Sequence, residues 1–143
     1  SINIKYDFIC SACGTGGTLA GLILGLNNKA FAIGFSVLKG GEFLNQNIKS
    51  HLKYFNAEDF NNWQINLDYH FGGYAKTTKE LIAFCDDFYQ KHNIIMEPIY
   101  TGKMFFGLFD LIKQNYFPAN STIIAVHTGG LQGIEGLKFR NRL

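Results

Sequence analysis

The segment that most constrains the fold is a glycine-rich turn between two apolar stretches near the amino terminus. Residues 6–12 have the composition of a short buried strand, and residues 19–26 form an apolar stretch long enough for a buried helix. Between them stands Gly14-Thr15-Gly16-Gly17-Thr18. Because a strand that passes through a tight turn into a helix is a building unit of α/β proteins, we expect a sheet whose strands are joined by helices.

The rest of the chain continues this alternation. Residues 30–38 are almost continuously apolar, which is typical of a strand in a parallel sheet covered on both faces. Apolar spacing predicts helices over 43–55 and 103–114 and strands over 63–69 and 122–127. A further helix is predicted to follow a cap at Thr77 or Thr78 and to continue to about residue 92. We therefore predict one α/β domain over residues 1–143, with a mostly parallel open sheet and helices on both faces.

The composition excludes several classes of protein. The net charge is +2 and the basic residues are scattered, so nothing indicates a surface that binds nucleic acid. No apolar run approaches the roughly 20 residues that a membrane helix needs. Three cysteines without regular spacing argue against a disulfide framework and favour a cytoplasmic protein. A hydrophobic fraction of 47% is high for a lone domain and favours a buried interface, such as that of a homodimer.

Cys10-Ser11-Ala12-Cys13 forms a C-x-x-C pair, which supports a redox function as a minor alternative. Such a pair offers too few ligands for structural zinc, and we predict no metal site. In a redox protein, Cys13 would lie near a helix N-terminus, where the pKa of its thiol would fall. We favour the simpler interpretation, a strand end followed by a glycine loop.

The glycine loop itself predicts a phosphate site. Several glycines allow backbone N–H groups to converge on one point, and a helix N-terminus adds positive potential there. Thr15 and Thr18 supply hydroxyl groups. The pattern is not a P-loop, and Leu19 stands where a dinucleotide-binding motif has its third glycine. The alternative is a tight turn that requires glycine and binds nothing.

The glycine loop and two further motifs together give the chain a family resemblance. Residues 11–18 match the S-x-x-G-[ST]-x-G-T loop that holds the phosphate of pyridoxal phosphate (PLP) in enzymes built like the tryptophan synthase β chain. Residues 97–103 resemble a D-P-V-Y-[TSE]-G-K segment, and residues 123–130 resemble I-x-F-x-H-T-G-G. Together they resemble the D-cysteine desulfhydrase and 1-aminocyclopropane-1-carboxylate (ACC) deaminase family, over nearly all of this chain but only about the second half of the family's chain.

The resemblance implies a tryptophan synthase β-like PLP fold and a set of site residues. Tyr100 and Tyr74 match active-site tyrosines, and Tyr100 would transfer protons if the pKa of its phenol were lowered. Lys103 and His127 belong to the motifs without an assigned role. The residues expected to bind PLP are Cys13, Gly14, Thr15, Gly16, Gly17 and Thr18 at the phosphate, with Thr101, Thr128 and Gly129 near the ring.

Thr101 is the main basis for choosing between the two chemistries of the family. The resemblance places it opposite the pyridine nitrogen, where the deaminases have a glutamate. A carboxylate keeps that nitrogen protonated and a hydroxyl does not, so Thr101 favours a D-cysteine desulfhydrase-like elimination that gives pyruvate, ammonia and sulfide. The alternatives are an ACC deaminase and, in another class, a non-catalytic phosphate- or cofactor-binding α/β module.

One departure from the family limits these expectations. The family forms its Schiff base through a lysine in an amino-terminal motif, and no segment of this chain matches that motif. We therefore expect the chain to be the carboxyl-terminal portion of the PLP-binding large domain, with the missing amino-terminal half as its partner. The chain alone is expected to be inactive, because PLP enzymes need this lysine to hold the cofactor aldehyde.

Overall fold

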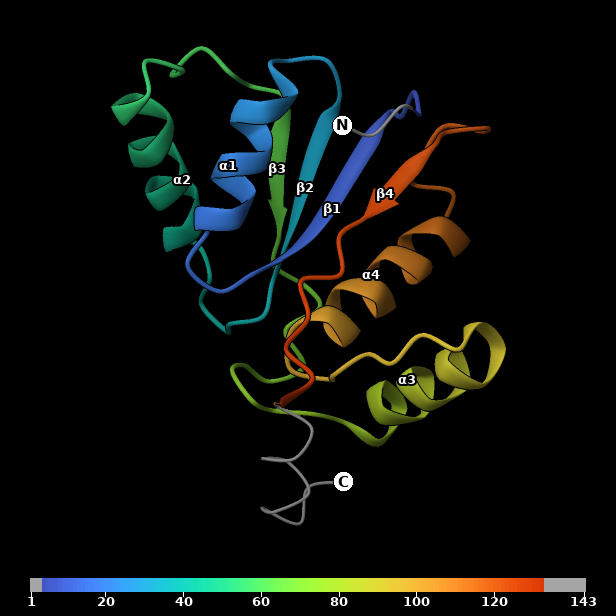
Figure 1. Cartoon of the computed structure of the whole chain (residues 1–143). Helices are drawn as coiled ribbons and strands as arrows, with labels where there is room; N and C mark the ends of the chain where they lie inside the picture. The colour runs from blue at the N-terminus through green and yellow to red at the C-terminus, as the bar shows by residue number, and fades with distance from the viewer. Residues whose placement is uncertain (1–3, 133–143) are drawn as a thin grey trace.

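The computed structural model describes residues 4–132 as a parallel sheet between two pairs of helices (Figure 1). The four strands lie in the order β3-β2-β1-β4 and all of them are parallel. This arrangement confirms the predicted fold class. In chain order the elements are β1 (Phe8–Cys13), α1 (Gly17–Leu26), β2 (Phe31–Ser36), α2 (Phe43–Tyr54), β3 (Trp63–Asn66), α3 (Lys79–His92), α4 (Thr101–Lys113) and β4 (Ile123–Ala125).

The two outer strands are shorter than the sequence predicted. The strand expected over 63–69 ends at Asn66, because the Asn66 side chain accepts a hydrogen bond from the Asp68 amide (2.9 Å) and turns the chain out of the sheet. The strand expected over 122–127 is reduced to Ile123–Ala125. Among the described residues both strands pair on one side only, so fewer hydrogen bonds hold their ends in the ladder.

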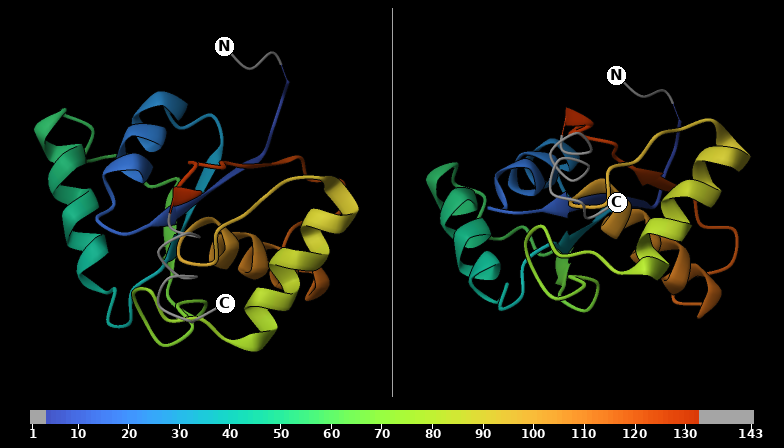
Figure 2. Two further views of the ribbon diagram at one scale, coloured as in Figure 1. Left: turned by 60° about the horizontal axis from the view of Figure 1, so that its bottom comes forward. Right: turned by 90° about the horizontal axis from the view of Figure 1, so that it is seen from below.

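Two hydrophobic cores cover the two faces of the sheet. One core joins the sheet to α1 and α2, and the other joins it to α3 and α4. Figure 2 shows the two helix pairs on opposite sides of the strands. Successive side chains of a strand point to opposite faces, so β1 contributes Ile9 to the first core and Cys10 to the second. The predicted cover of helices on both faces is therefore confirmed.

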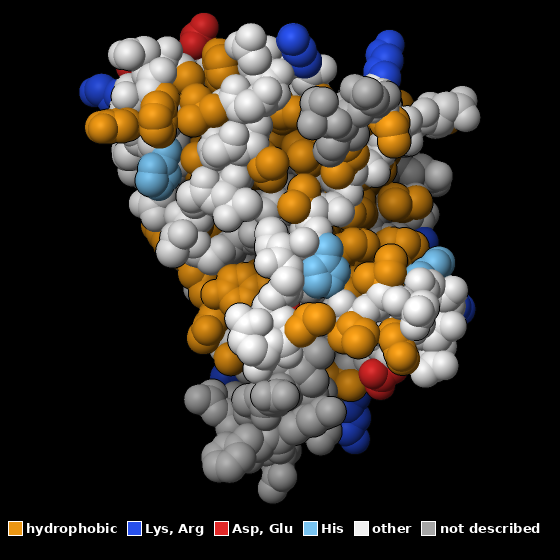
Figure 3. Space-filling view, in the orientation of Figure 1, with side chains coloured by type: hydrophobic (Ala, Val, Ile, Leu, Met, Phe, Trp, Pro, Cys, Tyr) orange, Lys and Arg blue, Asp and Glu red, His pale blue; other side chains and the backbone are white. Residues whose placement is uncertain are grey.

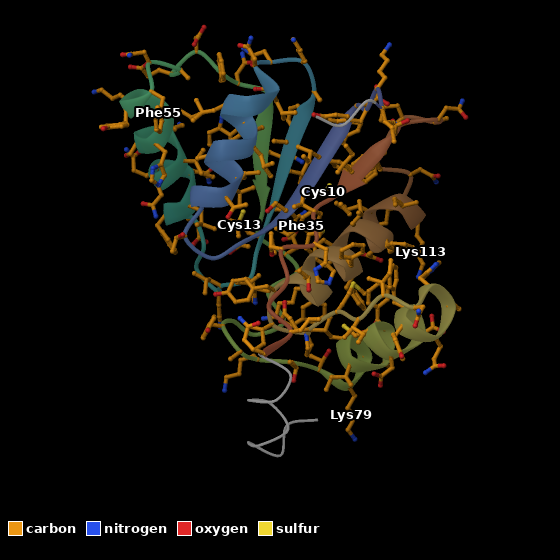
Figure 4. The ribbon with its side chains drawn as sticks, viewed as in Figure 1. Cys10, Cys13, Phe35, Phe55, Lys79 and Lys113 are labelled. Carbon is orange, nitrogen blue, oxygen red and sulfur yellow. The ribbon has the colours of Figure 1, made fainter. Side chains whose placement is uncertain are left out.

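The same alternation separates the two cysteines of the C-x-x-C pair. Cys13 lies in the core under α1, and Cys10 lies in the core under α4 (Figure 4). Both thiols are free, and burial raises the pKa of each to about 12. A thiol that stays protonated is a poor nucleophile, and side chains on opposite faces of one strand cannot join in a disulfide. The redox interpretation of Cys10 and Cys13 is wrong for this reason.

The loops that follow the strands meet at one edge of the sheet. Because the strands are parallel, their carboxyl ends point the same way, toward the lower edge in Figure 1. Ligands of open α/β sheets bind at this edge. Within residues 4–132, none of the helices has the length and apolar character needed to cross a membrane.

Gly34 in β2 allows α1 to approach the sheet closely. A Cβ atom there would lie 2.5 Å from Leu19 Cδ2 and 2.7 Å from Cys13 Sγ. We expect Gly34→Ala to lower the free energy of unfolding by about 1–3 kcal/mol, the usual cost of overpacking a core. Gly21→Ala is the control, because a Cβ at Gly21 meets nothing within 4 Å, and it should raise stability by about 0.5–1 kcal/mol. Urea unfolding of the two variants measures both, and equal effects would contradict the packing argument.

The buried thiols make stability depend on alkaline pH. The pKa of Cys10, Cys13 and Cys85 is raised by burial from 9.0 to about 12. A raised folded-state pKa stabilises the fold fully below pH 9, and this contribution is lost as the pH rises from 9 toward 12. We expect the free energy of unfolding to fall over that range, and Cys10→Ala to fall less steeply than the wild type. Urea unfolding at pH 7, 9 and 10.5 measures the two slopes, and identical slopes would show that Cys10 does not contribute.

Candidate functional site

The turn between β1 and α1 forms a small hollow, here called the cradle, at the N-terminus of α1. Gly16 caps α1 with a φ of 90°, a left-handed conformation that favours glycine. The first turn of α1 has neither a side-chain cap nor an acidic residue, so its amide groups have no competing acceptor from these sources. A hollow of about 40 Å³ lies here, lined by residues 12–19. A helix N-terminus with converging amides fits a phosphate group.

The predicted phosphate-binding residues lie together around this hollow, with one difference. Thr15 and Thr18 are exposed and line it. Cys13 also lines it, but its Sγ atom is buried and lies 3.8 Å from the Ser11 carbonyl. The side chain of Cys13 therefore belongs to the core, which leaves its backbone for a ligand.

Tyr100 and Tyr74 lie beside the glycine loop. A Cβ atom at Gly14 would lie 3.2 Å from Tyr100 Cε1 and 3.3 Å from the phenol oxygen. The ring of Tyr74, a residue 59% exposed, packs edge-on against Tyr100 with 6.0 Å between the ring centroids. The fold thus brings together the loop and both tyrosines that the sequence predicted.

The electrostatics of Tyr100 differ from the expectation. Burial raises the pKa of its phenol above the usual value, and Tyr74 and Glu97 add to the rise. From the sequence, Tyr100 was expected to transfer protons only if the pKa of its phenol were lowered. The residues around Tyr100 raise this pKa instead. At neutral pH the phenol keeps its proton, so it is a hydrogen-bond and proton donor in this chain.

Glu97 supports the segment that carries Tyr100, a role that sequence analysis did not assign to it. Its carboxylate is buried, at 1% exposure, and accepts hydrogen bonds from three consecutive backbone amides just before and at the start of α4. The shortest N···O distances are 2.6 Å for Ile99, 2.9 Å for Tyr100 and 2.6 Å for Thr101. An acidic side chain just before a helix was the available signal, since carboxylates favour this end of a helix.

Thr101 is enclosed by this arrangement. Its side chain is fully buried, and its hydroxyl lies 3.1 Å from Glu97 Oε1. A carboxylate only accepts, so the hydroxyl donates its single proton to Glu97. Thr101 therefore does not present its hydroxyl to a ligand in this conformation, whereas Thr128, the other predicted hydroxyl, is exposed.

His127 has a structural role that the motif alone did not reveal. Its Nδ1 atom accepts a hydrogen bond from the Gly129 amide (3.0 Å), so Nε2 carries the proton and donates it to the Ile95 carbonyl (2.8 Å). The next glycine, Gly130, packs against Glu97, since a Cβ there would lie 3.3 Å from Glu97 Cγ. His127 thus fixes the loop after β4 on the segment that precedes α4.

Lys103, the other motif residue without a role, is fully buried in α4. Its Nζ atom lies within hydrogen-bond distance of three backbone carbonyls, and burial lowers the pKa of its ammonium group to about 8 although Glu97 acts in the opposite sense. The lining of the hollow contains no lysine.

A larger groove, of about 640 Å³, lies between α2 and β3. Lys49, Lys53 and Trp63 are among its lining residues, and it shares none with the hollow at the glycine loop. We favour the glycine loop as the candidate site, because Tyr100, with Tyr74 packed against it, lies beside the N-terminus of α1. No group of three potential metal ligands occurs in residues 4–132.

Comparison with known proteins identifies the family of the chain. The family model described as "Pyridoxal-phosphate dependent enzyme" matches residues 1–129. A protein of Pyrococcus furiosus, provisionally assigned as an ACC deaminase, is 36% identical over 140 residues, which cover 92% of this chain and 42% of that protein. A mitochondrial bifunctional D-cysteine desulfhydrase/ACC deaminase of Arabidopsis thaliana is 32% identical over 92% of this chain and 34% of its own length.

A solved structure extends the similarity to three dimensions. The crystal structure of an ACC deaminase homologue matches with a TM-score of 0.77 and 33% identity, over 99% of this chain and 45% of that one. The chain thus spans less than half the length of these relatives. With the family model covering most of the sequence, the chain belongs to the family of pyridoxal-phosphate dependent enzymes.

Proposed function

We propose that this chain is the phosphate-binding part of a PLP-dependent lyase or deaminase that acts on a small amino acid. The observation that carries the proposal is the convergence of Tyr100 and Tyr74 on the glycine loop at the N-terminus of α1. The names of the relatives, D-cysteine desulfhydrase and ACC deaminase, support the same class of reaction. When bound, PLP supplies an electron sink for bonds at the α-carbon of an amino acid.

Each part of the site has a proposed task. The amides of residues 14–18 and the hydroxyls of Thr15 and Thr18 bind the phosphate, and the positive end of α1 favours its charge. The exposed Thr128 and the adjacent Gly129 border the ring from the end of β4. The protonated phenol of Tyr100 donates a proton or a hydrogen bond at its oxygen atom, and Tyr74 packs against it.

We propose a D-cysteine desulfhydrase-like elimination as the parent reaction, because residue 101 is a threonine and not a carboxylate. One observation favours the second candidate, an ACC deaminase. Position 101 is the one at which the deaminases have a glutamate. Here the hydroxyl of Thr101 donates a hydrogen bond to the buried carboxylate of Glu97, so a carboxylate lies next to this position. The solved relative is also described as an ACC deaminase homologue.

The proposed partner is the amino-terminal half that bears the lysine, and a homodimer is proposed for the assembled enzyme. Figure 3 shows hydrophobic side chains reaching the surface across the middle of one face, with most acidic and basic ones near its margins. Ile94, Ile95 and Leu131 are each more than 40% exposed. Such a surface supports a protein partner. The free, buried cysteines support a reducing compartment, which we propose is the cytoplasm.

Titration of the chain with PLP tests this assignment, followed by borohydride reduction and intact mass. We expect saturable binding through the phosphate without a stoichiometric covalent adduct, because no lysine lines the hollow. One adduct per chain on a single lysine would contradict the proposal and make the chain self-sufficient. Activity on D-cysteine or ACC after mixing with a lysine-bearing amino-terminal half distinguishes an enzyme part from a non-catalytic binding module.

Gly16→Ala tests the cradle directly. The substitution forces a side chain into a left-handed conformation, and its Cβ would lie 3.1 Å from Ile48 Cγ1. We expect about tenfold weaker binding of both PLP and inorganic phosphate, the equivalent of about 1.4 kcal/mol. Gly25→Ala is the matched control on the same helix, since a Cβ there meets nothing within 4 Å. Phosphorus NMR titration measures both affinities, and an unchanged affinity in Gly16→Ala would place the phosphate elsewhere.

A further inference from the structure

Lys103 holds its charged group in a closed cage of backbone carbonyls. The side chain is fully buried, and Nζ lies 3.4 Å from the Val37 oxygen, 2.9 Å from the His70 oxygen and 2.8 Å from the Gly73 oxygen. An ammonium group has three N–H donors, so these three acceptors use all of them. In its protonated form Lys103 has all three donors engaged, and the burial of its side chain denies it the access that a nucleophile requires.

The three carbonyls come from loops at the carboxyl ends of two strands. Val37 directly follows β2, while His70 and Gly73 lie in the loop between β3 and α3. The carbonyl oxygens of His70 and Gly73 also accept the turn hydrogen bonds from the amides of Gly73 (3.0 Å) and Lys76 (3.1 Å). The ammonium group thus binds the same two oxygens that shape the turn.

Tyr74 is the next residue after Gly73, and its position depends on this turn. Its side chain is 59% exposed, so packing from the core does not fix it, and its ring meets Tyr100 edge-on. Tyr100 in turn directly precedes α4, the helix that carries Lys103. Both tyrosines are therefore connected to α4. Tyr100 directly precedes the helix in the chain, and Tyr74 follows Gly73, whose carbonyl binds the ammonium group of Lys103.

We propose that Lys103 is a positioning residue that holds residues 70–74 so that Tyr74 packs against Tyr100 beside the glycine loop. This role of Lys103 deepens the proposed function, and it rests on that function in one respect, that the pair of Tyr100 and Tyr74 borders the cofactor. Burying an ammonium group is costly, and an apolar side chain would fill the space more cheaply. The lowered pKa of Lys103, at about 8, reflects that cost. Arginine is a poor substitute, because its planar group cannot point at three converging oxygens.

Hydrogen exchange of the chain tests the positioning role. Lys103→Met keeps the length of the side chain and removes the donors. We expect the amides of Gly73 and Lys76 to exchange at least about tenfold faster, while the amides of β1 and β2 keep their rates, because local opening is separate from global unfolding. Lys113→Met is the control, since Lys113 lies exposed at the far end of the same helix (Figure 4). Unchanged loop exchange, or equal acceleration in the strands, would overturn the proposal.

A measurement on the wild-type chain keeps the test valid if Lys103→Met fails to fold. The Nζ resonance of Lys103 should exchange slowly with water and show couplings across hydrogen bonds to the carbonyl carbons of His70 and Gly73. A rapidly exchanging Nζ group without these couplings would overturn the cage and, with it, the positioning role.

Binding measurements separate this inference from the proposed function. Inorganic phosphate needs only residues 12–19, whereas PLP also meets the tyrosine pair. Lys103→Met should therefore weaken PLP binding by about tenfold and leave phosphate binding within about twofold of the wild type. If the wild type binds neither ligand, the proposed function fails, and the hydrogen-exchange measurement still tests whether Lys103 holds residues 70–74. If the variant loses both affinities equally, or neither, Lys103 does not act through the tyrosines.

Discussion

The site depends on one buried carboxylate. Glu97 accepts hydrogen bonds from the amides of Ile99, Tyr100 and Thr101, which fixes the backbone at the start of α4 and at Tyr100. The loop after β4 packs on the same carboxylate through Gly130, and His127 ties this loop to Ile95. Two loops that are distant in sequence thus share one support. A buried charge must have its hydrogen bonds satisfied, which makes the position of Glu97 hard to change.

Lys103 places the opposite charge two residues into the same helix. Glu97 and Lys103 both lie away from water, and each is surrounded by backbone groups and not by the other's charged atoms. Charges held in this way favour one arrangement of the backbone, because any alternative leaves donors or acceptors unpaired. The glycine loop, by contrast, is open to solvent at Thr15 and Thr18. The protein thus combines a hydrogen-bonded support under the tyrosines with a solvent-accessible hollow at the glycine loop.

Local patterns were sufficient to predict much of this molecule. The helix Lys79–His92 was predicted from its apolar spacing and from two candidate caps, Thr77 and Thr78. The structure places the cap at Thr78, whose side chain accepts a hydrogen bond from the Leu81 amide. The hollow at the glycine loop followed from the glycines and the helix behind them, since both act within a few residues. The outer strands were predicted too long, because strand ends depend on neighbours in the sheet and not on composition alone.

The sequence by itself determined the α/β order, the glycine cradle, and the motifs that contain both tyrosines and identify the family, because each resides in a short, contiguous pattern. Only the tertiary structure decided that Cys10 and Cys13 face opposite cores, that Thr101 is enclosed by Glu97, and that the phenol of Tyr100 keeps its proton. These outcomes depend on burial and on hydrogen bonds between segments that meet only after folding. Neither quantity can be read from residue types along the chain.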